Sequence, residues 1–293
     1  MSFAGVYAAT TTPFRADGSL DVERYEEHCA WLTAEGVDGI IPNGSLGEYE
    51  ALTDAERAGV VTAALAGAGG RIPVVPGVSG KSGAEARRWA EHAAQAGAPA
   101  VMALPPTSHK PTDAEVVAHY AEVAKAGLPI IAYNNPFSTR VDLTPELLAL
   151  IAAEVELVVA VKEFSQDVRR IWRIREEAPR LEPICGCDDT FVESMLAGAT
   201  GWIAGFVNAF PAQSVRLHRL CAAGDYATAA KLYRAMLPIL RWDADPRFVQ
   251  AIKLGQEEAG RYGGPVRLPR LPLTPDDEAR VRAAARAALE AGC

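Results

Sequence analysis

A lysine at the end of an apolar run is the residue in this sequence best suited to covalent chemistry. Lys162 follows the run Leu-Val-Val-Ala-Val at 157–161 and precedes Glu163. Apolar surroundings disfavour the charged form of an amine, and only the neutral amine attacks a carbonyl carbon. The position therefore predicts a lysine that forms a Schiff base. The structural alternative is a lysine that ends a strand and extends into solvent.

Two further features have the chemistry that such a reaction needs. Tyr133 supplies a phenol that could carry protons to and from a substrate bound on Lys162. The turn Gly44-Ser45-Leu46-Gly47 offers backbone N–H groups and a serine hydroxyl that could hold a carboxylate, with glycines that permit close approach. Each feature has a plain alternative, an aromatic cover on the core or a simple turn. Together with the lysine they predict a site for a 2-oxo acid.

The sequence predicts neither a metal centre nor a cofactor. Its five cysteines lack Cys-x-x-Cys spacing, and its histidines do not cluster with carboxylates, so we expect no zinc site and no disulfide; the cysteines are Cys29, Cys185, Cys187, Cys221 and Cys293. Gly80-Lys81-Ser82 is similar to the end of a phosphate-binding loop, but Val75 stands where the first glycine is required. A dinucleotide-binding glycine motif after the first strand is also lacking.

Composition indicates an ordinary globular protein. The chain has 293 residues, of which 49% are hydrophobic and 23% charged, and its formal charge of -8 argues against a nucleic-acid partner. Residues 1–6 do not form a basic region followed by an apolar stretch, and the apolar segments are too short to cross a bilayer. We therefore expect a cytoplasmic protein without a membrane partner.

A repeated junction reveals how these residues are positioned. A helical pattern ends in glycine before an apolar strand at Gly36, Gly97, Gly127 and Gly198, where glycine accepts the left-handed conformation that closes a helix. Capping signals at Thr53, Thr112 and Thr144 begin helices. The apolar runs predict strands at 6–9, 39–41, 72–75, 100–103, 130–132, 157–161, 182–185 and 202–204.

About eight short apolar strands that alternate with about eight helices predict a (β/α)8 barrel. An open doubly wound sheet is the alternative fold. After Phe210-Pro211 the pattern is wholly helical, at 222–240, 246–259 and 276–291. We expect the barrel to span residues 1–222 and a helical extension packed on the barrel to span residues 223–293. In a barrel the chemistry gathers at the carboxyl ends of the strands, so Lys162, Tyr133 and the glycine turn become neighbours.

Several motifs occur in an order known from one family, namely Thr11-Thr12-Pro13-Phe14, Gly44-Ser45-Leu46-Gly47-Glu48, Tyr133-Asn134-Asn135-Pro136, Val161-Lys162-Glu163, and Gly201-Trp202-Ile203 with Asn208 and Pro211. With them the chain resembles the dihydrodipicolinate synthase and N-acetylneuraminate lyase family over nearly its whole length. The resemblance implies a barrel that is usually a homotetramer, with Lys162 as the imine lysine and Tyr133 as the proton relay. It assigns Gly44, Leu46, Ile203 and Ser138 to substrate binding. We expect Ser45 to be the third catalytic residue.

Three departures from the family pattern concern the substrate. The loop at 104–111 lacks the tyrosine that true synthases carry there, Ser138 stands in place of an arginine, with Arg140 two residues onward, and Leu46 replaces a threonine. Loss of an arginine that pairs with a substrate carboxylate should weaken binding substantially. The sequence therefore disfavours lysine biosynthesis, and the large substrate of N-acetylneuraminate lyase needs more polar lining.

The Δ1-pyrroline-4-hydroxy-2-carboxylate deaminases are a better match, because residues 248–253 and 265–269 resemble their C-terminal segment. As a hypothesis, Lys162 attacks the ring imine carbon, transimination opens the ring, and hydroxyl and ammonia are then lost. A small 2-oxo acid or cyclic imino acid is the expected partner. The alternatives are a 4-hydroxy-tetrahydrodipicolinate synthase, a 2-keto-3-deoxy sugar acid aldolase or dehydratase, and a barrel that binds oxo acids as a sensor.

Overall fold

The computed structural model describes residues 2–291. Parallel strands alternate with helices along the chain, and the fold is a (β/α)8 barrel followed by C-terminal helices, as the sequence predicts. The chain divides into two compact units, residues 2–4 with 74–203 and residues 5–73 with 204–291. These divisions do not test the predicted boundary at 222/223, which stays a prediction.

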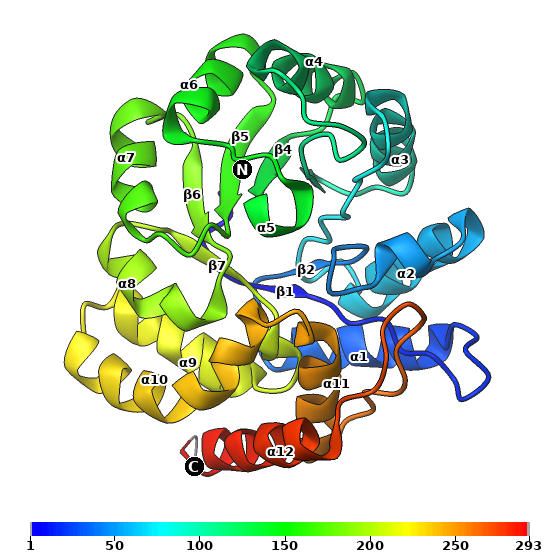
Figure 1. Ribbon diagram of the computed structural model, residues 1–293, viewed down its shortest axis with the longest axis vertical. Helices are drawn as coiled ribbons and strands as arrows, with labels where there is room; N and C mark the ends of the chain where they lie inside the picture. Colours follow the sequence, from blue (N-terminus) through cyan, green and yellow to red (C-terminus); the bar gives the residue numbers. More distant parts are fainter. Residues whose placement is uncertain (1, 292–293) are drawn as a thin grey trace. The chain divides into compact units, whose positions relative to one another are not determined.

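The first unit is built on strands that pair in parallel in the order β3, β4, β5, β6, β7. In Figure 1 its larger helices lie outside these strands. Almost every strand residue is buried, which explains why the strands are continuous apolar runs. The elements are α3 (Gly83–Gln95), β3 (Val101–Ala103), α4 (Asp113–Ala124), β4 (Ile130–Asn134), α5 (Pro136–Thr139), α6 (Pro145–Glu154), β5 (Val158–Glu163), α7 (Arg169–Glu177), β6 (Glu182–Cys185), η2 (Asp188–Thr190), α8 (Phe191–Leu196) and β7 (Gly201–Ala204), whose last residue belongs to the second unit.

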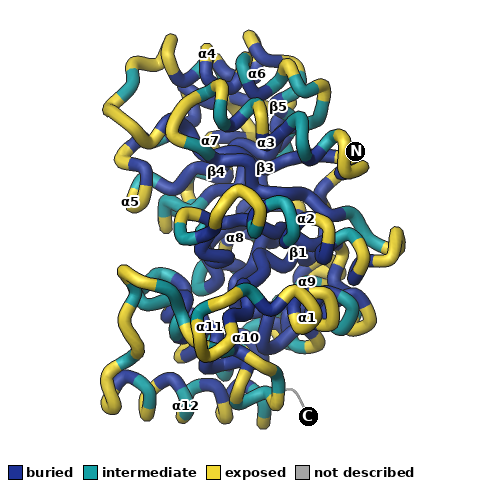
Figure 2. Tube along the Cα trace, turned by 90° about the vertical axis from the view of Figure 1, so that its right-hand side faces the viewer, coloured by how far each residue is buried: buried dark blue, intermediate teal, exposed yellow. Residues whose placement is uncertain are grey.

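The second unit contains the parallel pair of β1 with β2 and the helices of the C-terminal segment. Within it α12 packs against α10 and α11, and α9 packs against β1. The burial colouring of Figure 2 shows buried positions recurring along α12, as expected for a helix with one packed face. Its elements are β1 (Gly5–Ala9), α1 (Val22–Ala34), β2 (Gly39–Ile41), η1 (Tyr49–Ala51), α2 (Asp54–Ala68), η3 (Phe206–Asn208), α9 (Pro211–Ala222), α10 (Tyr226–Leu240), η4 (Arg241–Ala244), α11 (Phe248–Glu258) and α12 (Pro275–Glu290).

The local signals in the sequence are confirmed. Gly36, Gly97, Gly127 and Gly198 have φ of +88°, +90°, +78° and +100°, so each takes the positive φ expected after a helix. The Thr53 and Thr112 capping boxes are both formed, with each threonine bonded to the glutamate three residues onward. These devices fix where the helices of the barrel begin and end.

The third expected strand, at 72–75, is not formed. In its place Pro73 accepts a hydrogen bond from the Ile40 N–H at 3.0 Å. Further along, Gly77 forms an isolated bridge with Met102, whose N–H donates to the Pro76 carbonyl. Pro73 and Pro76 have no N–H to give to a ladder, so the segment stays extended without becoming a regular strand. Residues 2–291 therefore contain seven strands in place of eight.

The cysteines lie in the interior. Cys29, Cys185, Cys187 and Cys221 are buried, and Cys293 lies outside the described residues. Burial raises the pKa of the Cys29 thiol and of the Cys185 thiol to about 12 each. Helices long and apolar enough to span a membrane are not found in residues 2–291.

A buried histidine ties α1 to the segment after β7 in the second unit. His28 is hydrogen-bonded through Nε2 to the Asn208 amide oxygen at 2.8 Å, and Asn208 donates to the Ala9 carbonyl at 2.6 Å. Asn208 is fully buried and His28 is 6% exposed. Burial lowers the pKa of His28 to about 4, because the interior disfavours the imidazolium.

We predict that His28 makes folding sensitive to acid. Its pKa is lower in the folded chain than in the unfolded chain, so its contribution is complete above the unfolded pKa and is lost as the pH falls through the folded pKa. The full shift corresponds to about 3 kcal/mol. His28→Gln should flatten the loss of stability between about pH 7 and about pH 4.5 in urea denaturation, whereas His109→Gln, at an exposed histidine, should not. Identical pH dependence in wild type and His28→Gln would contradict this role.

Candidate active site

Lys162 and Tyr133 lie side by side at the carboxyl ends of two adjacent strands. The register of β4 with β5 pairs them directly, and the Lys162 ammonium nitrogen lies 4.4 Å from the centroid of the Tyr133 ring. The two residues are 6% and 5% exposed. The pair therefore combines a nearly buried amine with an aromatic face that attracts a cation. Both strands extend further than expected, so these residues belong to the strand ends instead of following them.

The loop after Tyr133 orients its phenol. The side-chain amide of Asn135 donates to the Tyr133 oxygen at 3.1 Å. The Asn135 amide oxygen accepts the N–H of Ser138 and its carbonyl accepts the Thr139 hydroxyl, so Asn135 is itself held in place. Because the phenolic oxygen acts as acceptor in this bond, its proton remains available for transfer to another group.

The next pair in the register supports the site from behind. Asn134 and Glu163 are paired, and the Asn134 amide donates to the two Glu163 carboxylate oxygens at 3.2 and 3.0 Å. The Asn134 amide oxygen accepts the N–H of Leu143 at 2.9 Å. Burial raises the pKa of Glu163, opposed by its hydrogen bonds to Ser165 and Asn134. Since successive residues of a strand face opposite sides, this network holds the backbone while Tyr133 and Lys162 face the other way.

Gly186 is a site residue that the sequence did not reveal. A Cβ on this glycine would lie 2.8 Å from the Glu163 carbonyl oxygen and 2.9 Å from both Cγ and Cε of Lys162. The Gly186 N–H also donates to the Glu163 carbonyl at 2.9 Å. The absent side chain therefore provides the space that the Lys162 side chain occupies. A glycine between two cysteines could have drawn attention as a point of close approach.

The glycine turn belongs to the second unit. The Thr12 hydroxyl donates to the Gly47 carbonyl at 2.7 Å, and the Glu48 N–H donates to the Ser45 carbonyl at 3.1 Å. Within the described residues, the Ser45 hydroxyl and the N–H groups of Leu46 and Gly47 donate no hydrogen bond. The turn therefore presents a hydroxyl and backbone N–H groups that are not used by the fold, which is the arrangement expected of an anion-holding turn.

The other predicted substrate-binding residues have different surroundings. Ile203 lies in β7 and is fully buried. Ser138 lies in α5 and is exposed, while Arg140 ends that helix with φ of +60° and is also exposed. Lys162, Tyr133, Ser138 and Ile203 belong to the first unit, whereas Gly44, Ser45 and Leu46 belong to the second. Among residues 2–291, groups of three His, Cys, Asp or Glu side chains able to hold a metal ion are not found.

A barrel with a nearly buried lysine at the end of a strand is the arrangement expected of a Schiff-base lyase. Comparison with known proteins gives the family. The chain matches the Dihydrodipicolinate synthetase family over residues 2–288. It is 32% identical to a 4-hydroxy-tetrahydrodipicolinate synthase of Maridesulfovibrio salexigens, over 98% of this chain and 99% of that one. A synthase of the same name from Nitrobacter hamburgensis is 34% identical over 93% of this chain and 92% of its own length.

The structural similarity extends over the same length. YagE, a prophage protein of the dihydrodipicolinic acid synthase family from E. coli K12 solved in complex with pyruvate, has a TM-score of 0.92 at 29% identity, with 99% of each chain covered. This protein therefore belongs to the dihydrodipicolinate synthetase family. It is a lyase of the Schiff-base type, as the sequence predicts.

We predict that Gly186→Ala will impair catalysis without unfolding the chain. The new methyl group would overlap the Lys162 side chain and the Glu163 carbonyl, so the amine should be displaced from its place beside Tyr133. We expect kcat to fall by about tenfold or more, with some loss of stability because the Glu163 carbonyl must also shift. Gly59→Ala is the matched control, because a Cβ there meets nothing within 4 Å. Unchanged kcat in Gly186→Ala would show that Lys162 does not need this space.

Proposed function

We propose that this protein binds a 2-oxo acid as an imine on Lys162, with Tyr133 as the proton relay. The observation that carries the proposal is the nearly buried Lys162 ammonium against the Tyr133 ring, on paired residues of adjacent strands. Membership of a family of Schiff-base lyases supports it. A lysine that only ended a strand would extend into solvent, and this one is 6% exposed.

The chemistry follows from the groups present. The neutral amine attacks C2 of the oxo acid, and loss of water leaves a protonated imine. The protonated imine withdraws electrons from the C3–H bond, so a proton can leave C3. The electron pair of that bond then forms the C2=C3 double bond of an enamine, and the C2=N electrons move to the nitrogen. Tyr133, with its oxygen held by Asn135, would transfer the protons that these steps require. We further propose that the glycine turn of the second unit binds a carboxylate through the Ser45 hydroxyl and the N–H groups of Leu46 and Gly47, which the fold leaves unused.

Attack of this enamine on an aldehyde is the first candidate reaction. The two relatives named above, and further ones at 31–32% identity, are called 4-hydroxy-tetrahydrodipicolinate synthase. These names favour the synthase reaction over the deaminase reaction that the sequence motifs suggested. Pyruvate and aspartate semialdehyde are then the substrates to test first.

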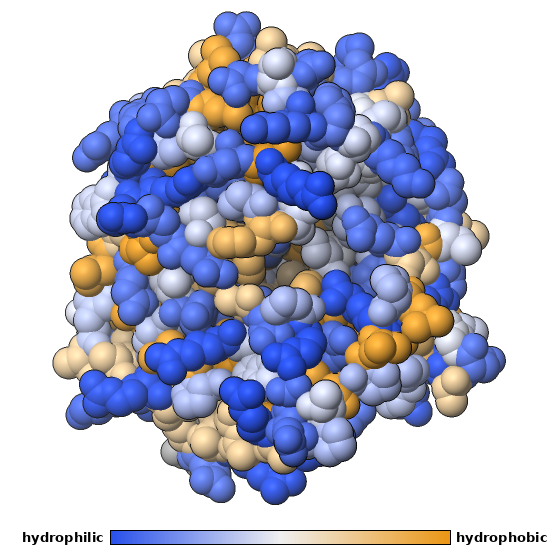
Figure 3. All heavy atoms as spheres, in the orientation of Figure 1, coloured by the Kyte–Doolittle hydropathy of each residue, from blue (hydrophilic) through white to orange (hydrophobic). Residues whose placement is uncertain are grey.

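The pyrroline deaminase remains a second candidate because of the α5 segment. Ser138 presents no charge to a second carboxylate, and the exposed Arg140 forms no ion pair within residues 2–291. Phe137 beside it is 62% exposed and makes an edge contact with Phe164, whose ring centroid lies 6.5 Å away. Figure 3 shows hydrophobic side chains at the surface over α5. An apolar segment after β4 suits a substrate whose far end carries no carboxylate.

Homotetramer assembly, taken from the family resemblance, stays part of this proposal.

We predict that borohydride reduction in the presence of pyruvate will trap a covalent adduct on Lys162. Reduction converts the imine to a stable secondary amine, so the protein mass should increase by the reduced pyruvyl group. Peptide mapping should place the added mass on Lys162. Lys162→Ala should show no adduct, and Lys125→Ala, at an exposed lysine, should be trapped like wild type. An unmodified wild-type protein after reduction in the presence of excess pyruvate would refute the imine.

We predict turnover of pyruvate with aspartate semialdehyde, measured beside Δ1-pyrroline-4-hydroxy-2-carboxylate with the same enzyme preparation. The synthase assignment requires condensation that Lys162→Ala abolishes. Turnover of the pyrroline alone would reject it in favour of the deaminase, and the Ser138→Arg variant then separates the two. An added arginine should lower KM for an aldehyde that carries a carboxylate and should not lower KM for the pyrroline.

A further inference from the structure

We infer that Lys253 and Arg267, in the C-terminal segment, are positioning residues that hold the Gly44–Gly47 turn in its binding conformation through Glu48. This inference rests on the proposed function, because it takes the turn as the site of the substrate carboxylate. All the residues concerned belong to the second unit. The Glu48 carboxylate is held by the Lys253 ammonium and by the backbone N–H of Arg267.

Glu48 directly follows the turn and has a constrained backbone. Its φ of +53° lies in the left-handed region that a residue with a side chain rarely adopts. Glu48 is 5% exposed, and its N–H donates to Ser45 while its carbonyl accepts the N–H of Ala51. A residue held in this conformation by its neighbours fixes the direction in which the chain leaves the turn, so movement of the Glu48 side chain would be passed to Gly47 and Leu46.

Lys253 reaches Glu48 from the middle of α11. Its ammonium lies 2.9 Å from the Glu48 Oε1 and 2.6 Å from the Pro265 carbonyl oxygen, and it lies 4.6 Å from the Phe14 ring centroid. The Lys253 and Glu48 side chains are each 2% exposed. Burial lowers the pKa of Lys253, and the Glu48 carboxylate opposes that shift by favouring the ammonium. The ion pair is thus shielded from water at both ends.

Arg267 also binds Glu48 and the residues around it. Its N–H donates to the Glu48 Oε2 at 3.0 Å, and its guanidinium donates to the carbonyls of Ala51 and Gly18 and to both oxygens of Glu56. Hydrogen bonding to Arg267 lowers the pKa of Glu56 to about 2. Arg267 therefore connects the residue after the turn with the start of α2, in which Glu56 belongs to the capping box.

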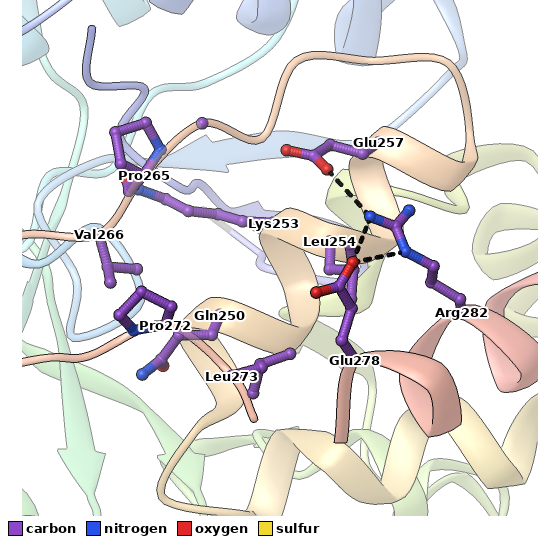
Figure 4. Close-up of a pocket in the computed structure, with 11 residues that line it drawn as sticks. Gln250, Lys253, Leu254, Glu257, Pro265, Val266, Pro272, Leu273, Glu278 and Arg282 are labelled. Carbon is purple, nitrogen blue, oxygen red and sulfur yellow. Dashed lines mark hydrogen bonds and ion pairs between the residues drawn. The ribbon is translucent and has the colours of Figure 1, made fainter. Parts of the chain in front are cut away.

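The close approach of α11 and the 263–267 segment makes this arrangement rigid. A Cβ on Gly263 would lie 2.1 Å from the Lys253 carbonyl oxygen, so only glycine allows the segment to lie this near. Figure 4 shows Lys253 running from α11 toward Pro265, on the opposite side of the pocket from the ion pairs of Arg282 with Glu257 and Glu278. Lys253 is one of the residues that line this pocket, which has a volume of about 210 Å³.

A buried ion pair is a weak source of stability, which is why we assign this one to position. Removing two charges from water costs nearly as much as their attraction returns, and apolar replacements of similar shape are often equally stable. Unlike an apolar pair, the ion pair fixes the direction of the Glu48 carboxylate, which accepts from the Lys253 ammonium at Oε1 and from the Arg267 N–H at Oε2. The ion pair would then be retained for the geometry of the turn, and the effects on stability and on binding should separate in a suitable pair of variants.

The test compares Lys253→Met and Glu48→Gln, singly and combined. Lys253→Met alone leaves Glu48 buried with fewer partners and should destabilise the chain, whereas the double variant removes both charges and should regain stability. We expect KM for pyruvate to rise by about tenfold in the double variant while kcat changes by less than about threefold. Arg282→Met, which breaks exposed and half-buried pairs on α12, is the control for a general weakening of the C-terminal segment.

Arg267→Lys is the variant to use when the double variant folds poorly. It keeps the positive charge and loses the forked contacts to Gly18 and Glu56, so KM for pyruvate should again rise. Amide hydrogen exchange of the Gly44–Ala51 peptide, measured without substrate, should be about tenfold faster in the double variant and unchanged in Arg282→Met.

The outcomes distinguish this inference from the proposed function. Unchanged KM and unchanged exchange in a stable double variant would overturn the positioning role, whatever the reaction. Faster exchange with a normal KM would also overturn it, because the turn would then loosen without consequence for binding. If the wild-type protein gives no borohydride adduct, the proposed imine is rejected. Faster amide exchange of the Gly44–Ala51 peptide in the double variant would still show that the ion pair holds the turn.

Discussion

The parallel register of β4 with β5 is the constraint on which the candidate site depends. It places Tyr133 opposite Lys162 and Asn134 opposite Glu163. A slip of one residue would send the lysine and the tyrosine to different faces of the sheet. The hydrogen bonds from Asn134 to both oxygens of Glu163 hold this register on the face of the strands opposite to Lys162 and Tyr133. The pair that holds the register, Asn134 with Glu163, thus directly follows the proposed reactive pair, Tyr133 with Lys162, along the same two strands.

The candidate site of the first unit combines rigid parts with open space, because Asn135 holds the phenol and the absent side chain of Gly186 leaves room for the lysine. In the second unit, the N–H groups of Leu46 and Gly47 in the glycine turn are not used by the fold. Groups that are set before the substrate arrives need little reorganisation during the reaction. Glu48, which directly follows the glycine turn, is also nearly buried, although it carries no reactive group in the proposed reaction.

Local signals in the sequence predicted much of the fold. The glycines at 36, 97, 127 and 198 and the capping threonines were sufficient to mark the helix ends, because their conformations depend on near neighbours. The apolar run before Lys162 and the position of Tyr133 predicted their burial. The prediction of a third strand at 72–75 was wrong, because the prolines at 73 and 76 have no N–H to donate to a ladder. Lys253 and Glu48 are separated by 205 residues, and no local pattern indicates such a pair. The same holds for Gly186, whose role depends on a side chain from another strand.

The burial of Cys29 and Cys185 has a consequence for how the protein responds to its surroundings. With thiol pKa values near 12, these two sulfurs are almost entirely protonated at neutral pH, and the thiol form is a poor nucleophile and a poor target for oxidants. Peroxide, disulfide exchange and alkylating reagents therefore act slowly on them while the chain is folded. Cys185 precedes the glycine that makes room for Lys162, so the backbone next to the amine is protected from redox modification at that sulfur.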